Sequence, residues 1–264
     1  MSELTEPATV NESWVTLFAF TPRGGIERLF GPVRTLTTFE AAIEDSFGEA
    51  FEQPPLKLRS ERFDATGALI ERVRYDETGA LADRAVFGYD AAGRVVERTH
   101  YDPVGQAYLH YLYSFDEHGR LVEMTGLSPE GVLSSSLKRR YDDAGRLVGV
   151  IEVLDRNGTT RQTRWRITYH DHMPAAEAHG EVSEDGRIVE RLVHRYDSDG
   201  YIAESARLDA DGHWQVRERL IYDPRRERGN WVRRVTESCA RQFGEERWRP
   251  ARVTYRRFIF FEQD

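Results

Sequence analysis

The sequence predicts an all-β protein: a repetitive antiparallel meander of short hairpins that forms one curled or spiralling sheet, with few or no helices. Three observations support this prediction. The phrase aromatic-or-leucine, Asp, x, x, Gly returns many times between about residues 60 and 231. The glycines of these phrases are evenly spaced, and the runs between them are short and rich in β-branched and aromatic residues.

The turn glycines keep a strict rhythm. Their spacings alternate between 12 and 14 residues, so two successive units form a 26-residue period. The same spacing resumes at residues 186, 200 and 212 after an irregular stretch. The first series comprises Gly67, Gly79, Gly93, Gly105, Gly119, Gly131 and Gly145.

The repeated phrase has the chemistry of a hairpin turn. The Asp carboxylate accepts hydrogen bonds from backbone N–H groups two or three residues later, the two middle residues suit a type I turn, and Gly adopts the positive φ that follows. A type I turn with a glycine bulge is a common three-residue hairpin connection. Each phrase therefore marks a chain reversal.

The even spacing also predicts which side chains share a face of the sheet. Side chains alternate between faces with a period of two, so spacings of 12 and 14 both preserve the phase. We therefore expect one buried face and one solvated face. The buried face would hold Leu69, Val73 and Tyr75, then Leu81, Phe87 and Tyr89, and the solvated face Arg72, Arg74, Arg98 and His100.

Two regions precede the clear repeats. Residues 1–30 are expected to form an N-terminal cap, because repeat arrays need their ends covered, and residues 31–264 a single repeat domain. Local propensity favours a helix over residues 36–52. We nevertheless predict two long strands, 33–44 and 50–63, because the repeat context favours strands and Pro54-Pro55 blocks a continuing helix.

Composition narrows the classes of partner. Of the 264 residues, 39% are hydrophobic and 31% charged, and the mean hydropathy is −0.63, which allows only a thin core. The net charge of −8 argues against electrostatic binding of nucleic acid, and the local run of arginines after residue 224 is interpreted as a solvated sheet face.

The sequence carries no sign of export or of membrane insertion. The first residues are acidic where a signal peptide would be basic, and no stretch reaches the ~18 apolar residues that span a bilayer. The single cysteine, Cys239, excludes an intramolecular disulfide and a thiolate zinc cluster, and it is expected only to pack. We expect a cytoplasmic protein without a membrane partner, and export by a dedicated secretion system stays open.

The phrases Tyr89-Asp-x-x-Gly-Arg-Val95, Phe115 to Leu121 and Tyr141 to Leu147 resemble the YD repeats of bacterial RHS and teneurin-type proteins. The resemblance covers about residues 60–231, and weaker similarity extends over 31–51 and 229–236. In large members of that family the repeats form a spiralling antiparallel sheet, a hollow shell around a toxin domain. This chain is far shorter than such shells.

Two departures limit what the resemblance implies. No distinct toxin segment follows the repeats. The Asp102-Pro103 pair is similar to the family's self-cleavage signature, but it occupies an ordinary repeat position, where Pro after the turn Asp is plain turn chemistry.

One loop contains candidate metal ligands. Residues 169–180 interrupt the glycine rhythm and carry His170, His172 and His179. In an extended segment, His170 and His172 would point the same way and could share one ion. No third and fourth ligand follow at fixed spacing, so we expect no metal, no other cofactor and no catalytic residues.

Aromatic residues outside the main Tyr column are candidate ligand-binding residues. Tyr108 alternates with Tyr111 and Tyr113 along one strand, which would make that strand aromatic on both faces. Burial on both faces is the favoured interpretation, and an exposed aromatic platform is the alternative. The full set of candidates is Tyr108, Tyr111, Tyr113, Trp165 and Trp214.

Three functions follow, in order of support. The first is a non-enzymatic repeat scaffold that binds a protein partner, which includes an accessory role beside a toxin-delivery system. The second is a module that binds cell-wall or capsular glycans through exposed Tyr and Trp. The third is an enzyme or metal site in the 169–180 loop. Exposed sheet edges would also permit oligomerisation.

Overall fold

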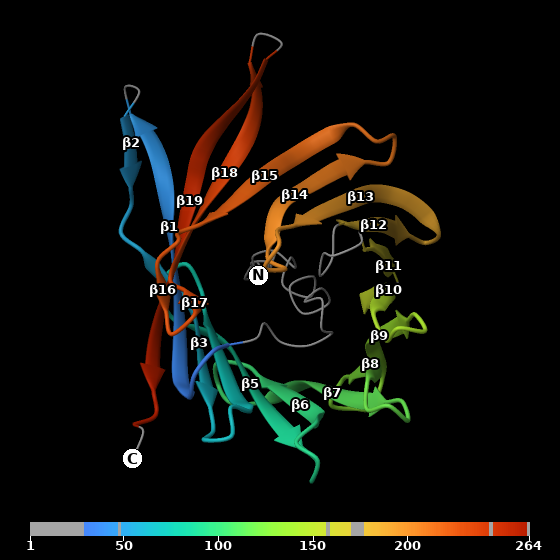
Figure 1. Ribbon diagram of the computed structural model, residues 1–264. Coiled ribbons are helices and arrows are strands. Elements are labelled where there is room, and N and C mark those ends of the chain that lie inside the picture. The colour runs from blue at the N-terminus through green and yellow to red at the C-terminus, as the bar shows by residue number, and fades with distance from the viewer. Residues whose placement is uncertain (1–28, 47–48, 157–158, 170–176, 243–244, 263–264) are drawn as a thin grey trace, which may run out of the picture.

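The computed structural model describes residues 29–46, 49–156, 159–169, 177–242 and 245–262, and within them the chain is entirely β, as predicted (Figure 1). All strand pairs are antiparallel. Across these ranges no helix has the length and apolar character needed to cross a bilayer. Nearly all of the expected cap, residues 1–30, lies outside the described residues.

The strands follow the predicted repeat along the chain. They are β1 (Val33–Ser46), β2 (Glu49–Glu52), β3 (Leu56–Phe63), β4 (Leu69–Tyr75), β5 (Leu81–Tyr89), β6 (Val95–Tyr101), β7 (Ala107–Phe115), β8 (Leu121–Leu127), β9 (Leu133–Tyr141), β10 (Leu147–Arg156), β11 (Thr159–Thr168), β12 (Glu177–Glu184), β13 (Arg187–Tyr196), β14 (Ile202–Asp209), β15 (Trp214–Tyr222), β16 (Arg226–Glu227), β17 (Asn230–Trp231), β18 (Arg233–Gln242) and β19 (Glu245–Phe260).

The sheet closes on itself, which corrects the prediction of a curled or spiralling sheet. Strand β1 pairs with β3 along one edge and with β19 along the other. Neighbouring pairs continue from β3 to β15, then through β18 to β19, so 16 strands form a barrel (Figure 1). Closure gives both edges of the array a hydrogen-bonding partner, and an open sheet would leave them exposed.

The predicted hairpin over residues 33–63 is confirmed, and its described residues, 33–46 and 49–63, contain no helix. Strand β1 has 14 residues and buries Val33 and Leu36. Hydrogen bonding on both edges of β1 overrides the helical propensity of its sequence. The second predicted strand, 50–63, is divided into β2 and β3, because Pro54 and Pro55 offer no N–H to a ladder.

The Asp-x-x-Gly turns have the predicted backbone geometry, as the first one shows, but the Asp carboxylate accepts from N–H groups two and four residues later and not two or three. The Gly67 N–H donates to the Asp64 carbonyl at 3.0 Å, and the Asp64 N–H donates to the Ala68 carbonyl at 2.9 Å. The Asp64 carboxylate accepts from the backbone N–H groups of Thr66 and Ala68. Gly67 has a φ of +86°, a region that glycine enters without steric cost.

A bulge in each hairpin from β3 to β9 corrects the predicted assignment of faces. Phe63 pairs with Leu69 but Arg62 pairs with Glu71, so Ile70 is an extra residue that reverses the phase of the strand. Equivalent bulges recur in the following hairpins. As a result, equivalent positions in successive 12- or 14-residue units lie on opposite faces of the sheet. Equivalent positions 26 residues apart lie on the same face, because two bulges separate them.

The exchange places charged side chains on the buried face, which lines the interior of the barrel. Glu61, Arg72, Ala85 and His100 are successive partners across four strands and are all buried. The prediction that Arg72, Arg98 and His100 lie on the solvated face is therefore wrong. Val73 and Tyr75 lie on the opposite face from Leu69, for the same reason.

The repeated phrase also links neighbouring repeats at several positions. The Tyr141 hydroxyl donates to the Leu121 carbonyl at 2.8 Å. Arg120 forms an ion pair with Asp116 at 2.7 Å, and its guanidinium lies 4.8 Å from the centre of the Tyr141 ring. The same hydroxyl-to-carbonyl bond is made by Tyr89, Tyr169 and Tyr222.

Replacing Tyr141 by Phe removes this hydroxyl and keeps the ring. We expect the free energy of unfolding to fall by about 1 kcal/mol, the usual net value of one hydrogen bond. Urea denaturation measures the change. Tyr101→Phe is the matched control, because within the described residues the Tyr101 hydroxyl has no hydrogen bond and should leave stability unchanged. Equal losses in both variants would contradict the role of the Tyr141 bond.

Candidate functional site

A buried ion pair joins Glu61 on β3 to Arg72 on β4, on the inner face of the barrel. Arg72 donates to the Glu61 carboxylate through Nε at 2.8 Å and through a terminal nitrogen at 2.5 Å, and Arg59 approaches the same carboxylate at 3.5 Å. Burial alone would raise the pKa of Glu61, but the charges of Arg59 and Arg72 lower it to about 2. Glu61 is thus ionised and compensated in the interior.

A second buried group surrounds Asp83 on β5. Its carboxylate lies 2.9 Å from His100 Nδ1, accepts a 2.6 Å hydrogen bond from the Tyr108 hydroxyl, and accepts another from Arg74 Nε at 3.1 Å. Burial opposes ionisation, but the hydrogen bond from His100 and the other contacts lower the pKa of Asp83 to about 2. All of these partners stabilise the ionised form, so the Asp83 carboxylate stays negatively charged although it is buried in the barrel wall.

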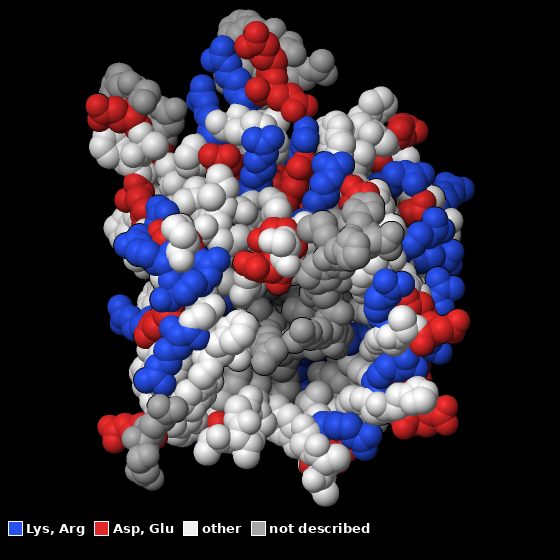
Figure 2. Space-filling model, viewed as in Figure 1, with Lys and Arg blue, Asp and Glu red and all other residues white. Residues whose placement is uncertain are grey.

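The outer face of β9 to β14 carries a different surface, a groove rich in cations. One row of directly opposed residues crosses the strands as Lys138, Ile151, Arg164, Glu181, Arg191 and Leu208. A second row, two residues along, contains Arg140, Gly149, Arg166, His179 and Val193. Figure 2 shows Lys and Arg gathered along this side of the barrel.

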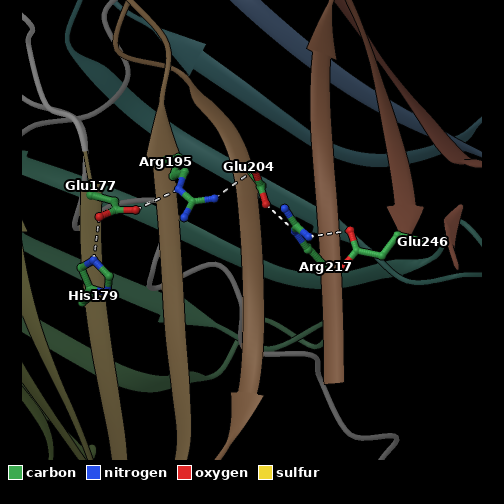
Figure 3. A network of polar contacts seen from close by, with 6 residues as sticks. All are labelled: Glu177, His179, Arg195, Glu204, Arg217 and Glu246. Carbon is green, nitrogen blue, oxygen red and sulfur yellow. Dashed lines mark hydrogen bonds and ion pairs between the residues drawn. The ribbon is translucent and has the colours of Figure 1, made fainter. Parts of the chain in front are cut away.

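An ion-pair network borders the groove on β12 to β15 and reaches β19 (Figure 3). Glu177 accepts from His179 at 2.9 Å and from Arg195 at 2.8 Å. The chain of contacts then continues from Arg195 to Glu204 (3.3 Å), Arg217 (2.5 Å) and Glu246 (2.9 Å). The hydrogen bonds from His179 and Arg195 lower the pKa of Glu177. Carboxylates and cations alternate along this border, so it is largely neutralised.

The structure separates the five aromatic candidates. Trp165 and Tyr111 are buried on the inner face, and Tyr113, two residues after Tyr111 on β7, is half-buried on the same face opposite Met124. The Tyr108 and Tyr111 rings both contact the His100 ring, at centroid distances of 5.9 and 5.7 Å. Tyr108 is therefore not opposite Tyr111 as predicted, because the bulge at the start of β7 lets its side chain reach the inner network. Trp214 is half exposed on the outer face, 5.4 Å from the Arg217 guanidinium.

The metal candidates are only partly described. His170 and His172 lie outside the described residues, and His179 is hydrogen bonded to Glu177 on the outer face. A different group, Asp209, Asp211 and His213, has ligand atoms within 4.8 Å of one another. These residues form an Asp-x-x-Gly turn, and the Asp209 carboxylate already accepts from the N–H groups of Asp211 and His213.

Sequence reasoning missed the outer groove. The available signal was the alternation Lys138-x-Arg140 followed by Arg164-x-Arg166, since residues two apart on a strand share a face. That signal shows a cationic stripe on each strand. It does not show that β9 and β11 each lie beside β10, which is what brings the two stripes together.

The buried His194 ring makes the stability of the protein depend on pH. Its ring stacks on Trp165 with centroids 5.1 Å apart, and burial lowers its pKa to about 4. The unfolded chain would take up this proton near the ordinary value of about 6.5. Stability from the neutral ring is therefore present above about pH 6.5 and is lost as the pH falls toward 4.

Replacing His194 by Phe keeps a ring against Trp165 and removes the titration. Between pH 7 and about 4.5 we expect the free energy of unfolding of the wild-type chain to fall by about 2–3 kcal/mol more than that of His194→Phe. Urea denaturation at both pH values measures this difference. His118→Phe changes an exposed turn histidine and should retain the wild-type dependence. Parallel pH profiles for His194→Phe and wild type would refute the assignment.

Comparison with solved structures supports the barrel fold. A porin-like protein from Bacteroides uniformis ATCC 8492 aligns with a TM-score of 0.55 at 11% sequence identity, over 88% of this chain and 98% of that one. This similarity extends to the fold alone. No curated protein matches the chain.

Comparison also finds the repeat. Alignments reach the Photorhabdus luminescens Tc holotoxin pore (13% identity, TM-score 0.23) and a TcdB2-TccC3-TEV structure (10% identity, TM-score 0.19), covering 74% and 79% of this chain but only 14% and 16% of those chains. The family model described as RHS Repeat matches residues 89–132. That segment contains two Asp-x-x-Gly-Arg turns, at Asp90 and Asp116, so this part of the chain is similar to RHS repeats and has their hairpin turns in the structure.

Proposed function

We propose that the chain is a non-catalytic scaffold that binds a partner protein on the outer face of the barrel, over β9 to β14. The observation that carries the proposal is the cationic groove, which is a concentrated patch of positive charge on a chain with a net charge of −8. A patch whose sign opposes that of the whole molecule indicates a surface shaped for recognition.

The distribution of the other polar residues supports a scaffold. The repeated Asp residues cap turns, their Arg neighbours pair with them, and the repeated Tyr hydroxyls hold carbonyls of the preceding repeat. The buried acids Glu61 and Asp83 are each compensated by cations or hydrogen bonds in the wall. These residues are accounted for by the fold, which leaves the outer face as the surface for function.

An accessory role beside a toxin-delivery system belongs to the same proposal. It rests on the RHS repeats, because the resemblance implies that larger family members enclose toxins within a repeat shell. In such a role the barrel would act by binding a partner, and the chemistry of the groove would determine which partner binds.

Binding of glycans is the second candidate, favoured by one observation. Arg217 lies between two indoles on the outer face, 5.4 Å from Trp214 and 5.3 Å from Trp248. Trp214 is half exposed and Trp248 is half-buried, and aromatic rings with an exposed face can stack on sugar rings. If glycans are the ligand, sedimentation with cell-wall material should retain the wild-type chain and lose Trp214→Ala.

Affinity capture with charge-reversal variants tests the scaffold. Immobilised wild-type chain should retain a partner protein from native lysate, and Lys138→Glu/Arg140→Glu should lose it, because reversed charges repel an acidic surface. The purified partner is then titrated against both chains by calorimetry. Arg187→Glu/Arg247→Glu changes the net charge equally at exposed positions outside the groove, and it should bind as wild type does. A partner retained equally by all three chains would place the binding surface elsewhere.

A further inference from the structure

The cations of the groove fall into two classes. Lys138 and Arg191 have acidic neighbours, at 3.4 Å from Glu123 and 2.7 Å from Glu181 respectively. Arg140, Arg164 and Arg166 are exposed, and among the described residues none of them has a carboxylate partner. These three guanidinium groups lie on β9 and β11, the two strands that flank β10, and they repel one another, so an anionic ligand that binds between them relieves that repulsion.

The shape of the groove leaves room for a ligand between these cations. Gly149 is directly opposed to Arg140 on one side and to Arg166 on the other. Because Gly149 has no side chain, the space between the two arginines stays open; a Cβ there would lie 3.6 Å from Arg140 Nε. The groove has a volume of about 720 Å³, within the range of about 300–1,000 Å³ typical of ligand sites.

Apolar side chains alternate with the cations. Ile151, which is 38% exposed, lies between Lys138 and Arg164 in the first row, and Leu208 follows Arg191 in the same row. In the second row Val193 is opposed to His179. A ligand that covers the groove therefore meets positive charge and apolar surface in turn, so a matching ligand needs both carboxylates and apolar groups.

We infer that the groove binds an extended acidic segment of a partner protein in which acidic residues alternate with apolar ones. This inference rests on the proposed function and names the chemistry of the partner. The strands under the groove are hydrogen bonded to neighbours on both edges. The segment therefore binds through its side chains and cannot add a strand to the sheet.

Nucleic acid is a poorer match for this surface. Binding of single strands relies on aromatic rings on which bases stack. The indole of Trp165, which lies beneath the groove, is 3% exposed and packs on the inner side against His194 and Gly180. The His179 ring is hydrogen bonded to Glu177. The apolar residues of the groove would also contact a charged phosphate backbone, and this contact would add no favourable binding energy.

Fluorescence anisotropy with a labelled peptide of alternating glutamate and leucine tests the inference on the full chain. We expect binding that weakens with salt and weakens about tenfold or more in Arg164→Glu/Arg166→Glu, since buried arginine contacts dominate such interfaces. Arg187→Glu/Arg247→Glu is the matched control and should bind as wild type does. Thermal unfolding confirms that each variant is folded, and Arg164→Gln/Arg166→Gln replaces the reversal if that variant unfolds.

Three competing probes separate the alternatives. A peptide of alternating glutamate and serine should bind more weakly than the leucine peptide, and oligothymidylate and inorganic polyphosphate more weakly still. Oligothymidylate or polyphosphate binding as tightly as the leucine peptide would overturn the inference, because charge alone would then suffice. Equal loss in the control variant would overturn it too. Self-association that disappears in Arg164→Glu/Arg166→Glu would assign the groove to a second copy instead.

The two proposals fail in different ways. If no peptide binds but a captured partner still depends on Lys138 and Arg140, the acidic-segment inference is wrong and the scaffold stands. If neither the peptide nor a partner depends on the groove, both are wrong.

Discussion

Closure of the sheet through β1 is the constraint on which the rest of the structure depends. A meander of hairpins has two free edges, and each edge displays unpaired backbone groups. Here β1 covers both, with Leu36 opposed to Glu61 on β3 and to Phe258 on β19. Once the ring is closed, every strand has an inside and an outside, and each side chain must suit one of them.

The bulge in each hairpin decides which side chains go inside. Without it, the repeated leucines and aromatics would stay on one face and the arginines on the other. With it, Arg72 and His100 enter the wall beside Glu61 and Asp83. Buried charges of this kind cost desolvation energy that their pairing offsets, and removing one partner typically costs about 3–5 kcal/mol. These pairs form only when the neighbouring strands are in the observed register, so they favour that register.

The same geometry makes the outer face available for recognition. The phrase residues hold the hairpins together near their turns, so the middle of each strand is free to vary on its outer side. Over β9 to β14 these positions carry arginines separated by Gly149 and by apolar residues. Over β12 to β15 they carry paired acids and bases instead. The contrast between a neutralised border and a groove in which Arg140, Arg164 and Arg166 have no carboxylate partner among the described residues is the physical basis of the proposed partner chemistry.

The sequence by itself determined the all-β class, the position of most Asp-x-x-Gly turns and the hairpin over residues 33–63, because turn chemistry and glycine's positive φ are local properties. The exception is the predicted turn at Asp155, which instead lies in β10 and pairs with Thr160. It could not determine the faces, since a one-residue bulge such as the one after Leu69 leaves no local signal and exchanges the two faces of the chain up to the next bulge. Closure also depends on a contact between residues about 220 positions apart, Leu36 and Phe258. The groove depends on both closure and the bulges. Arg140 and Arg166 lie on either side of Gly149 only in the closed and bulged sheet, because register across strands is a property of the tertiary structure.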